Sequence, residues 1–207
     1  MPYRPIGRPT VQSPKVERLI CKLERHYLMP AHAMLRLPVP NYRLLDPCHF
    51  ALAHLLLAAI AGVSTTLYSR TGGNGYRFKQ VLIDYYPFSF ESGNTLSPQQ
   101  AADTLWSVFR NPLAHDLGYD LETKAKTPEV KVFRVLRKSK TRGLTEKEIE
   151  ALEITSSRPT LEPTLSIRSD ATVLRIDALY WGVRQMLENL LADVSRVQAA
   201  ERLLPQI

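Results

Sequence analysis

Residues 47 to 69, PCHFALAHLLLAAIAGVSTTLYS, do most to decide the fold, because this stretch contains no Asp, Glu, Lys or Arg. Asp46 and Pro47 are typical of a helix N-cap followed by a first helical residue. A helix that is apolar on nearly every face is expected at the centre of a helical bundle. The stretch is also just long enough to cross a bilayer, although polar residues interrupt it. We favour the core helix and keep membrane attachment as a weaker interpretation, which pelleting with lipid vesicles would reveal. The interrupting residues are His49, His54, Ser64, Thr65 and Thr66.

Two further helices carry the same start pattern. Ser13-Pro14 and Ser97-Pro98 each place a capping residue before a proline, and Gln100 stands in the capping-box position. Apolar residues at helical spacing follow both starts. They are Val16, Leu19, Ile20, Leu23 and Tyr27 after the first, and Ala101, Ala102, Leu105, Trp106 and Phe109 after the second. Residues 76 to 86 predict another helix, which ends before Pro87.

The last third of the chain changes its pattern. Alternating apolar residues predict a strand at 130–136, and 164–168 with 173–176 predict a hairpin. Thr145 to Glu148 form a capping box that opens a short helix, and Asp177 is expected to cap a long last helix over 178–203. The sequence therefore predicts one mainly helical domain over residues 1–207. A small antiparallel β-sheet lies within an insert at 128–177, before the long C-terminal helix.

Charge and composition limit the function classes. The chain has 207 residues and a net charge of +7, which favours binding to polyanions such as nucleic acid. Cys21 and Cys48 are too few for a disulfide framework, and we expect both to be buried and reduced. The first fifteen residues lack the apolar run of a signal peptide, so a cytoplasmic protein is expected. The histidines lack metal-ligand spacing, and we expect neither a metal nor another cofactor.

One segment indicates chemistry. Residues 105 to 121 have the sequence LWSVFRNPLAHDLGYDL, in which Arg110 and His115 are separated by four residues and Asn111 follows the arginine. This pattern resembles the Arg-x4-6-His motif of the HEPN superfamily, a family of compact helical bundles. Many members are metal-independent ribonucleases of toxin–antitoxin and defence systems. The resemblance implies that Arg110, Asn111 and His115 are catalytic, that two chains share a cleft, and that an antitoxin-like protein is a partner. One toxin branch has a tyrosine where this chain has Leu117, which puts regulation through that tyrosine in doubt.

Elementary geometry bears on the same motif. On an ideal helix, residues five apart point about 140° away from each other. Pro112 disfavours the helical conformation at Asn111, so we expect the helix to stop or kink there and Asn111 to cap a new turn. Such a kink would turn Arg110 and His115 toward one cleft. There a neutral His115 could take the proton of a ribose 2′-hydroxyl while Arg110 stabilises the phosphate charge. The substrate would be RNA, and a homodimer would supply the second histidine.

The chain also has a dense basic region from Lys124 to Arg142. It could follow an RNA backbone, or it could be a solvated strand edge that discourages aggregation. Candidate RNA contacts in this region are Lys131, Arg134, Arg137 and Lys138, together with Arg77 beyond a glycine-rich turn. The alternative to an enzyme is a non-catalytic helical module of HEPN type that binds nucleic acid or a partner protein.

Overall fold

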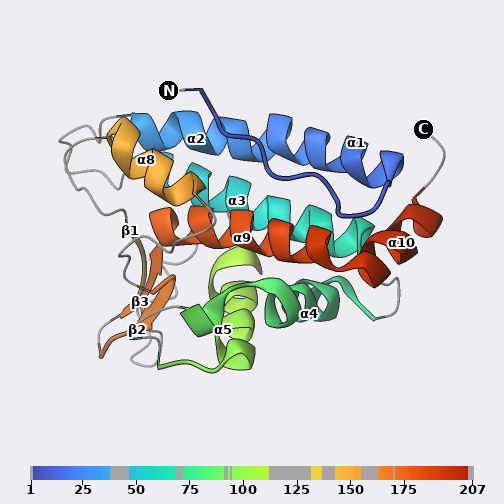
Figure 1. Ribbon diagram of the computed structural model, residues 1–207. Coiled ribbons are helices and arrows are strands. Elements are labelled where there is room, and N and C mark those ends of the chain that lie inside the picture. The colour runs from blue at the N-terminus through green and yellow to red at the C-terminus, as the bar shows by residue number, and fades with distance from the viewer. Residues whose placement is uncertain are drawn as a thin grey trace.

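The computed structural model describes residues 2–37, 47–68, 72–90, 93, 95–111, 132–136, 143–154, 163–169 and 171–204. Side chains are not described at 47, 48, 90, 132–134 and 136. The protein is mainly helical, with a small sheet at one end of the helices (Figure 1). Mainly helical architecture with a small sheet was predicted, and the structure confirms it.

Residues 14–36 form one nearly continuous helix, which an extended N-terminal segment crosses (Figure 1). Helix α1 (Pro14–Leu23) runs through the π-helix η1 (Glu24–Leu28) into α2 (Met29–Arg36). Residues 2–13, here called the strap, lie along these helices in extended form (Figure 1). Cys21 is exposed, so its predicted burial is wrong, because it lies outside the stripe of α1 that buries Val16, Ile20 and Leu23. The side chain of Cys48 lies outside the described residues.

Helix α3 (Pro47–Thr66) lies in the core. It packs against α4 (Asn74–Tyr85), η1, α2 and α9 (Ile176–Ala192). Within the described residues, His49–Thr66 is the one segment whose length and mean hydropathy suit a membrane span. Of this window, 44% is buried inside the protein, and several of its apolar residues are fully buried. These include Leu52, Ala53, Leu56, Leu57, Ile60 and Val63.

Two predicted helix starts are confirmed in detail, and one cap is different. Ser97 opens α5 (Pro98–Thr104), and Thr145 opens α8 (Glu146–Glu153), each with a complete capping box. Ser13 makes no side-chain cap for α1. Instead its hydroxyl donates to Glu201 in α10 (Val194–Leu203), and that carboxylate also accepts from the backbone amides at the start of α1. A distant carboxylate thus replaces the local cap.

The last helix differs from its prediction at both ends. Helix α9 begins at Ile176, and Asp177 is a buried first-turn residue, so its role as N-cap is wrong. The helical run is divided at Asp193, whose backbone leaves the helical region with ψ of 95°. Asp193 then caps α10 by accepting from the amide of Arg196 at 3.0 Å. Because the Asp193 side chain accepts from an otherwise free amide at the start of α10, the break costs little free energy.

The described sheet has three strands in the order β1-β3-β2. Strands β2 (Leu165–Ile167) and β3 (Ala171–Arg175) form the predicted antiparallel hairpin. Strand β1 (Val132–Leu136) pairs in parallel with β3, with Val132 opposite Ala171. The expectation of an antiparallel sheet is therefore wrong for this pair. Parallel strands need a crossover connection, and α8 lies in the segment between β1 and β3.

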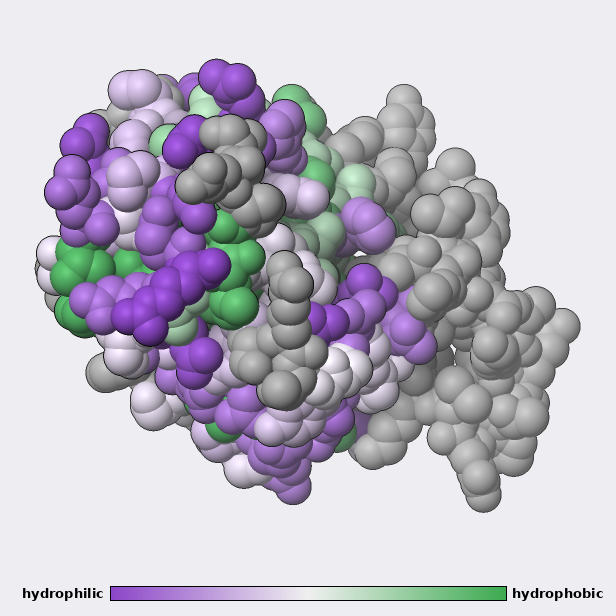
Figure 2. All heavy atoms as spheres, turned by 90° about the vertical axis from the view of Figure 1, so that its right-hand side faces the viewer, coloured by the Kyte–Doolittle hydropathy of each residue, from purple (hydrophilic) through white to green (hydrophobic). Residues whose placement is uncertain are grey.

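The face at the α10 end of the molecule is mostly hydrophilic. Figure 2 shows polar side chains over most of its coloured surface, with smaller apolar areas between them. Val197 and Ala200 turn the apolar side of α10 inward, and Val194 and Leu203 remain partly exposed. The described part of this face therefore presents scattered apolar residues, which are normal for a protein surface.

The 3-10 turn η2 (Phe88–Phe90) and the π-helix η3 (Leu105–Arg110) complete the described helical elements.

Candidate functional site

Arg110 closes the π-helix η3, which continues α5 without a break. The amide of Asn111 donates to the carbonyl of Trp106, five residues back, and Asn111 has helical angles of φ −68° and ψ −51°. The non-helical conformation predicted for Asn111 is therefore wrong, and the break and new turn predicted from Pro112 onward lie outside the described residues. The wider π turn lets the chain remain helical through the residue before Pro112. π-turns inside helices occur frequently at functional sites.

The side chain of Arg110 is held by an aromatic ring. Its guanidinium carbon lies 5.1 Å from the ring centroid of Trp106, within cation–π range. Trp106 in turn packs against Phe78 of α4, with ring centroids 5.3 Å apart. A Cβ on Gly75 would come within 2.8 Å of the indole ring, so only glycine lets the first turn of α4 approach so closely. Trp106 therefore joins Arg110 to the N-terminus of α4.

That helix end is electropositive. Gly73 provides no side-chain cap, and the amide of Arg77 is the first to bond back within the helix, to the carbonyl of Gly73. The preceding amides and the helix dipole therefore favour a negative group at this end. The Arg77 guanidinium donates to the side chain of Asn74 at 2.5 Å. Within the described residues, no acidic side chain pairs with Arg110, so its charge remains available.

Lys79, also on α4, is used differently. Its ammonium lies 2.9 Å from Asp103 of α5, and the hydrogen bond from Lys79 lowers the pKa of Asp103. This exposed ion pair fastens α4 to α5. We therefore assign Lys79 no part in ligand binding.

Most of the other predicted site residues lie outside the described residues. These are His115, Lys131, Arg137 and Lys138, and for Arg134 the backbone alone is described, in strand β1. In the order of the described strands, β1 lies at an edge of the sheet. The pairing of Arg110 with His115 therefore remains a prediction. Among the described residues, no group of three His, Cys, Asp or Glu side chains has the arrangement of a metal site.

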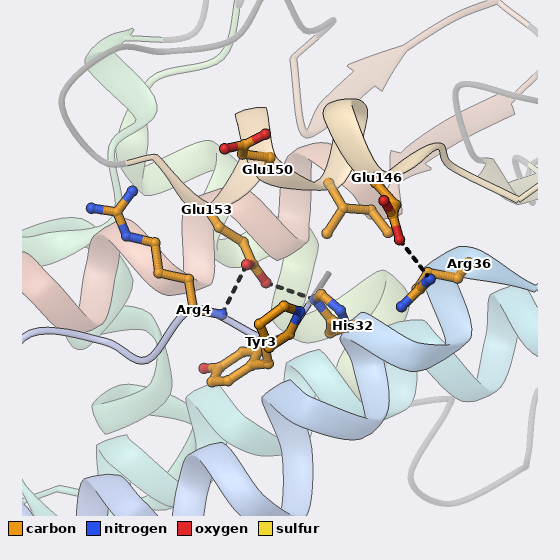
Figure 3. A pocket seen from close by; sticks show the side chains of 9 residues that line it. Tyr3, Arg4, His32, Arg36, Glu146, Glu150 and Glu153 are labelled. Carbon is orange, nitrogen blue, oxygen red and sulfur yellow. Dashed lines mark hydrogen bonds and ion pairs between the residues drawn. The ribbon is translucent and has the colours of Figure 1, made fainter.

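A second polar site lies under the strap and was not predicted. Its centre is Glu153, the last residue of α8, which is 3% exposed. One carboxylate oxygen accepts from the hydroxyl of Tyr180 at 2.7 Å and lies 2.8 Å from Nδ1 of His32. The other oxygen accepts from the backbone amide of Arg4 at 3.1 Å (Figure 3). Three helices and the strap therefore meet at one buried carboxylate.

Arg184 of α9 lies in the same cluster and is 1% exposed. Its Nη2 donates to the carbonyl of Arg4 at 2.8 Å, and its Nη1 lies 4.0 Å from Glu153. The guanidinium also lies over the rings of Tyr3 and Tyr180, at 5.1 and 5.9 Å. Burial raises the pKa of both tyrosines well above the usual range, so both hydroxyls stay protonated and act as donors.

The strap is fastened further along its length. The hydroxyl of Tyr3 and the amide of Ile6 both donate to Glu24 of η1, at 3.0 and 2.7 Å. Thr10 donates its hydroxyl to the carbonyl of Leu191 at 3.0 Å. The side chain of Ile6 is itself buried in the core. The strap is thus an integral part of the fold.

Sequence reasoning missed this cluster because its members are far apart in the chain. Glu153 is 121 residues from His32 and 149 from Arg4. One local feature could have indicated it: Arg184 lies among the apolar residues that α9 buries, where a cation requires a partner.

No protein-family model matches this chain, and no curated protein or solved structure is significantly similar to it.

Proposed function

We propose that this protein is a metal-independent endoribonuclease of HEPN type that cleaves RNA through attack of a ribose 2′-hydroxyl. The observation that carries the proposal is the placement of Arg110. Its guanidinium lies over Trp106, whose indole ring contacts the uncapped first turn of α4, and has no acidic partner among the described residues. A guanidinium and free backbone amides are the groups that bind a phosphate.

In this proposal Arg110 binds the scissile phosphate and stabilises the negative charge that grows on it. His115 removes the proton from the 2′-hydroxyl, and the 2′-oxygen attacks phosphorus while the bond to the 5′-oxygen breaks. The products are a 2′,3′-cyclic phosphate and a 5′-hydroxyl end. The leaving oxygen needs a proton from the opposite side, and a second copy of the chain supplies the histidine for it. The active form is therefore a homodimer.

The test compares single alanine variants in EDTA on single-stranded RNA. We expect His115→Ala and Arg110→Ala to reduce cleavage by about 100-fold or more. Arg25→Ala and His26→Ala are matched controls, because both side chains are exposed on η1 and their loss removes the same groups elsewhere. A 2′-deoxynucleotide at the cut position should abolish cleavage. Intact RNA with the wild-type protein, or equal cleavage by the wild type and His115→Ala, would refute the proposal.

The second candidate is a non-catalytic module of the same type that binds RNA or a partner protein. It is favoured by Leu117, which replaces the tyrosine of one toxin branch. In that case the wild type leaves RNA intact, and His115→Ala leaves partner binding unchanged. A cytoplasmic toxin or defence role with an antitoxin-like partner belongs to the same proposal, and co-purification of a partner from the native host would test it.

A further inference from the structure

A pocket of about 280 Å³ opens between the strap, α2 and α8. His32 and Glu153, both buried, line it together with the apolar side chains of Pro2, Tyr3 and Ile149. Figure 3 shows His32 between Glu153 on one side and Arg36 on the other. A largely apolar pocket with a few convergent polar groups is the usual form of a small-molecule site.

Glu153 holds the His32 ring in one orientation through Nδ1, which leaves Nε2 for a ligand. Glu153 accepts hydrogen bonds from Tyr180 and the Arg4 amide, so it is a carboxylate, and the facing Nδ1 of His32 carries the proton. In a neutral imidazole, Nε2 then has the lone pair and is an acceptor. His32 is 7% exposed, and no residue of the described chain bonds to Nε2. This nitrogen is a buried polar atom that the pocket presents to a ligand.

Charged side chains of both signs line the pocket. Arg36 pairs with Glu146 at 3.2 Å, and Arg184 lies behind Glu153 at 4.0 Å. The remaining charged lining residues, Arg4 and Glu150, have opposite signs. A charged ligand would meet both signs of charge here and would lose its hydration on entering a largely apolar pocket.

We propose that this pocket binds a small neutral ring molecule that donates one hydroxyl or ring N–H hydrogen bond to Nε2 of His32. The size fits, since an apolar cavity of about 150 Å³ accommodates benzene. The ring packs against Tyr3 and Ile149, and its single donor meets Nε2 of His32. This inference does not depend on the proposed ribonuclease activity.

The experiment titrates the full-length protein with four ring probes and follows the ¹³C-labelled imidazole of His32 and the methyl groups of Ile149 by NMR. Phenol has the donor, anisole keeps the oxygen without the donor, and benzoate and benzylamine add opposite charges. We expect saturable shifts with phenol, and binding about tenfold weaker for anisole, corresponding to one lost hydrogen bond. Both charged probes should bind more weakly than phenol.

His32→Asn tests the acceptor directly. Its amide nitrogen keeps a donor toward Glu153 but places no atom where Nε2 was. We expect phenol to bind this variant about tenfold more weakly, with His26→Asn on the exposed side of η1 as the unchanged control. No saturable shift with phenol, a charged probe binding as tightly as phenol, or anisole equal to phenol would each overturn the proposal. The wild-type comparisons decide it even if His32→Asn does not fold.

Discussion

Replacing Glu153 by Gln should strongly destabilise the fold, although the two side chains have the same shape. The carboxylate is buried, and four groups from three separate elements converge on it. An amide keeps one acceptor oxygen, but it turns an NH2 group toward one of these donors and leaves Arg184 without a counter-charge. Removing one partner of a buried ion pair costs about 3–5 kcal/mol. For a chain of this size, that corresponds to a fall in Tm of roughly 10 °C.

The assay is urea unfolding at pH 7, followed by circular dichroism. Glu150→Gln is the matched control, because Glu150 lies on the same helix, carries the same charge and is exposed. We expect the control to change the free energy of unfolding by less than about 0.5 kcal/mol. Should Glu153→Gln lose less than about 1 kcal/mol, the cluster does not fasten the strap to α8 and α9, and the energetic reasoning is wrong.

Three further predictions concern other parts of the fold. Gly182→Ala should cost about 2–3 kcal/mol in urea unfolding, because the new Cβ would collide with the hydroxyl of Tyr86, and an unchanged midpoint would contradict this. Hydrogen bonds, first from Ser195, hold the pKa of Asp193 at about 2, so its contribution to stability is complete above about pH 4 and is lost as pH falls through 2. Asp193→Asn should therefore lose less stability than the wild type between about pH 4 and 2, and parallel stability curves would exclude this role. Glu201→Ala should cost about 1 kcal/mol by removing the cap of α1, measured as a lower urea midpoint.

Helix positions were predictable from the sequence where the information is local. The boxes at Ser97 and Thr145 need only a residue three positions ahead, and both formed as predicted. The failures lie where a distant group competes. At the start of α1, Glu201 replaces Ser13 as the capping group. Asp177 is buried in the first turn of α9 and does not cap that helix. Parallel pairing of β1 with β3 likewise depends on a crossover that no local pattern specifies.

The candidate sites divide in the same way. Arg110 was indicated by a short motif, but its support from Gly75 through Trp106 comes from another helix. The cluster around Glu153 depends entirely on contacts between distant segments, so spacing rules for His, Asp and Glu could not reveal it. An arginine at a position where a helix is otherwise apolar is the local sequence signal that indicates such a cluster.

The two proposals rely on different charges and can fail separately. Arg110 must meet a phosphate, so its contribution should weaken as salt screens the interaction. The ligand proposed for the pocket at His32 is neutral, so phenol binding should change little between low and high salt. If His32→Asn abolished RNA cleavage while the protein stayed folded, the pocket would belong to the nuclease and the independence of the two sites would be wrong. If cleavage is unchanged in that variant and lost in Arg110→Ala, the chain carries two separate sites.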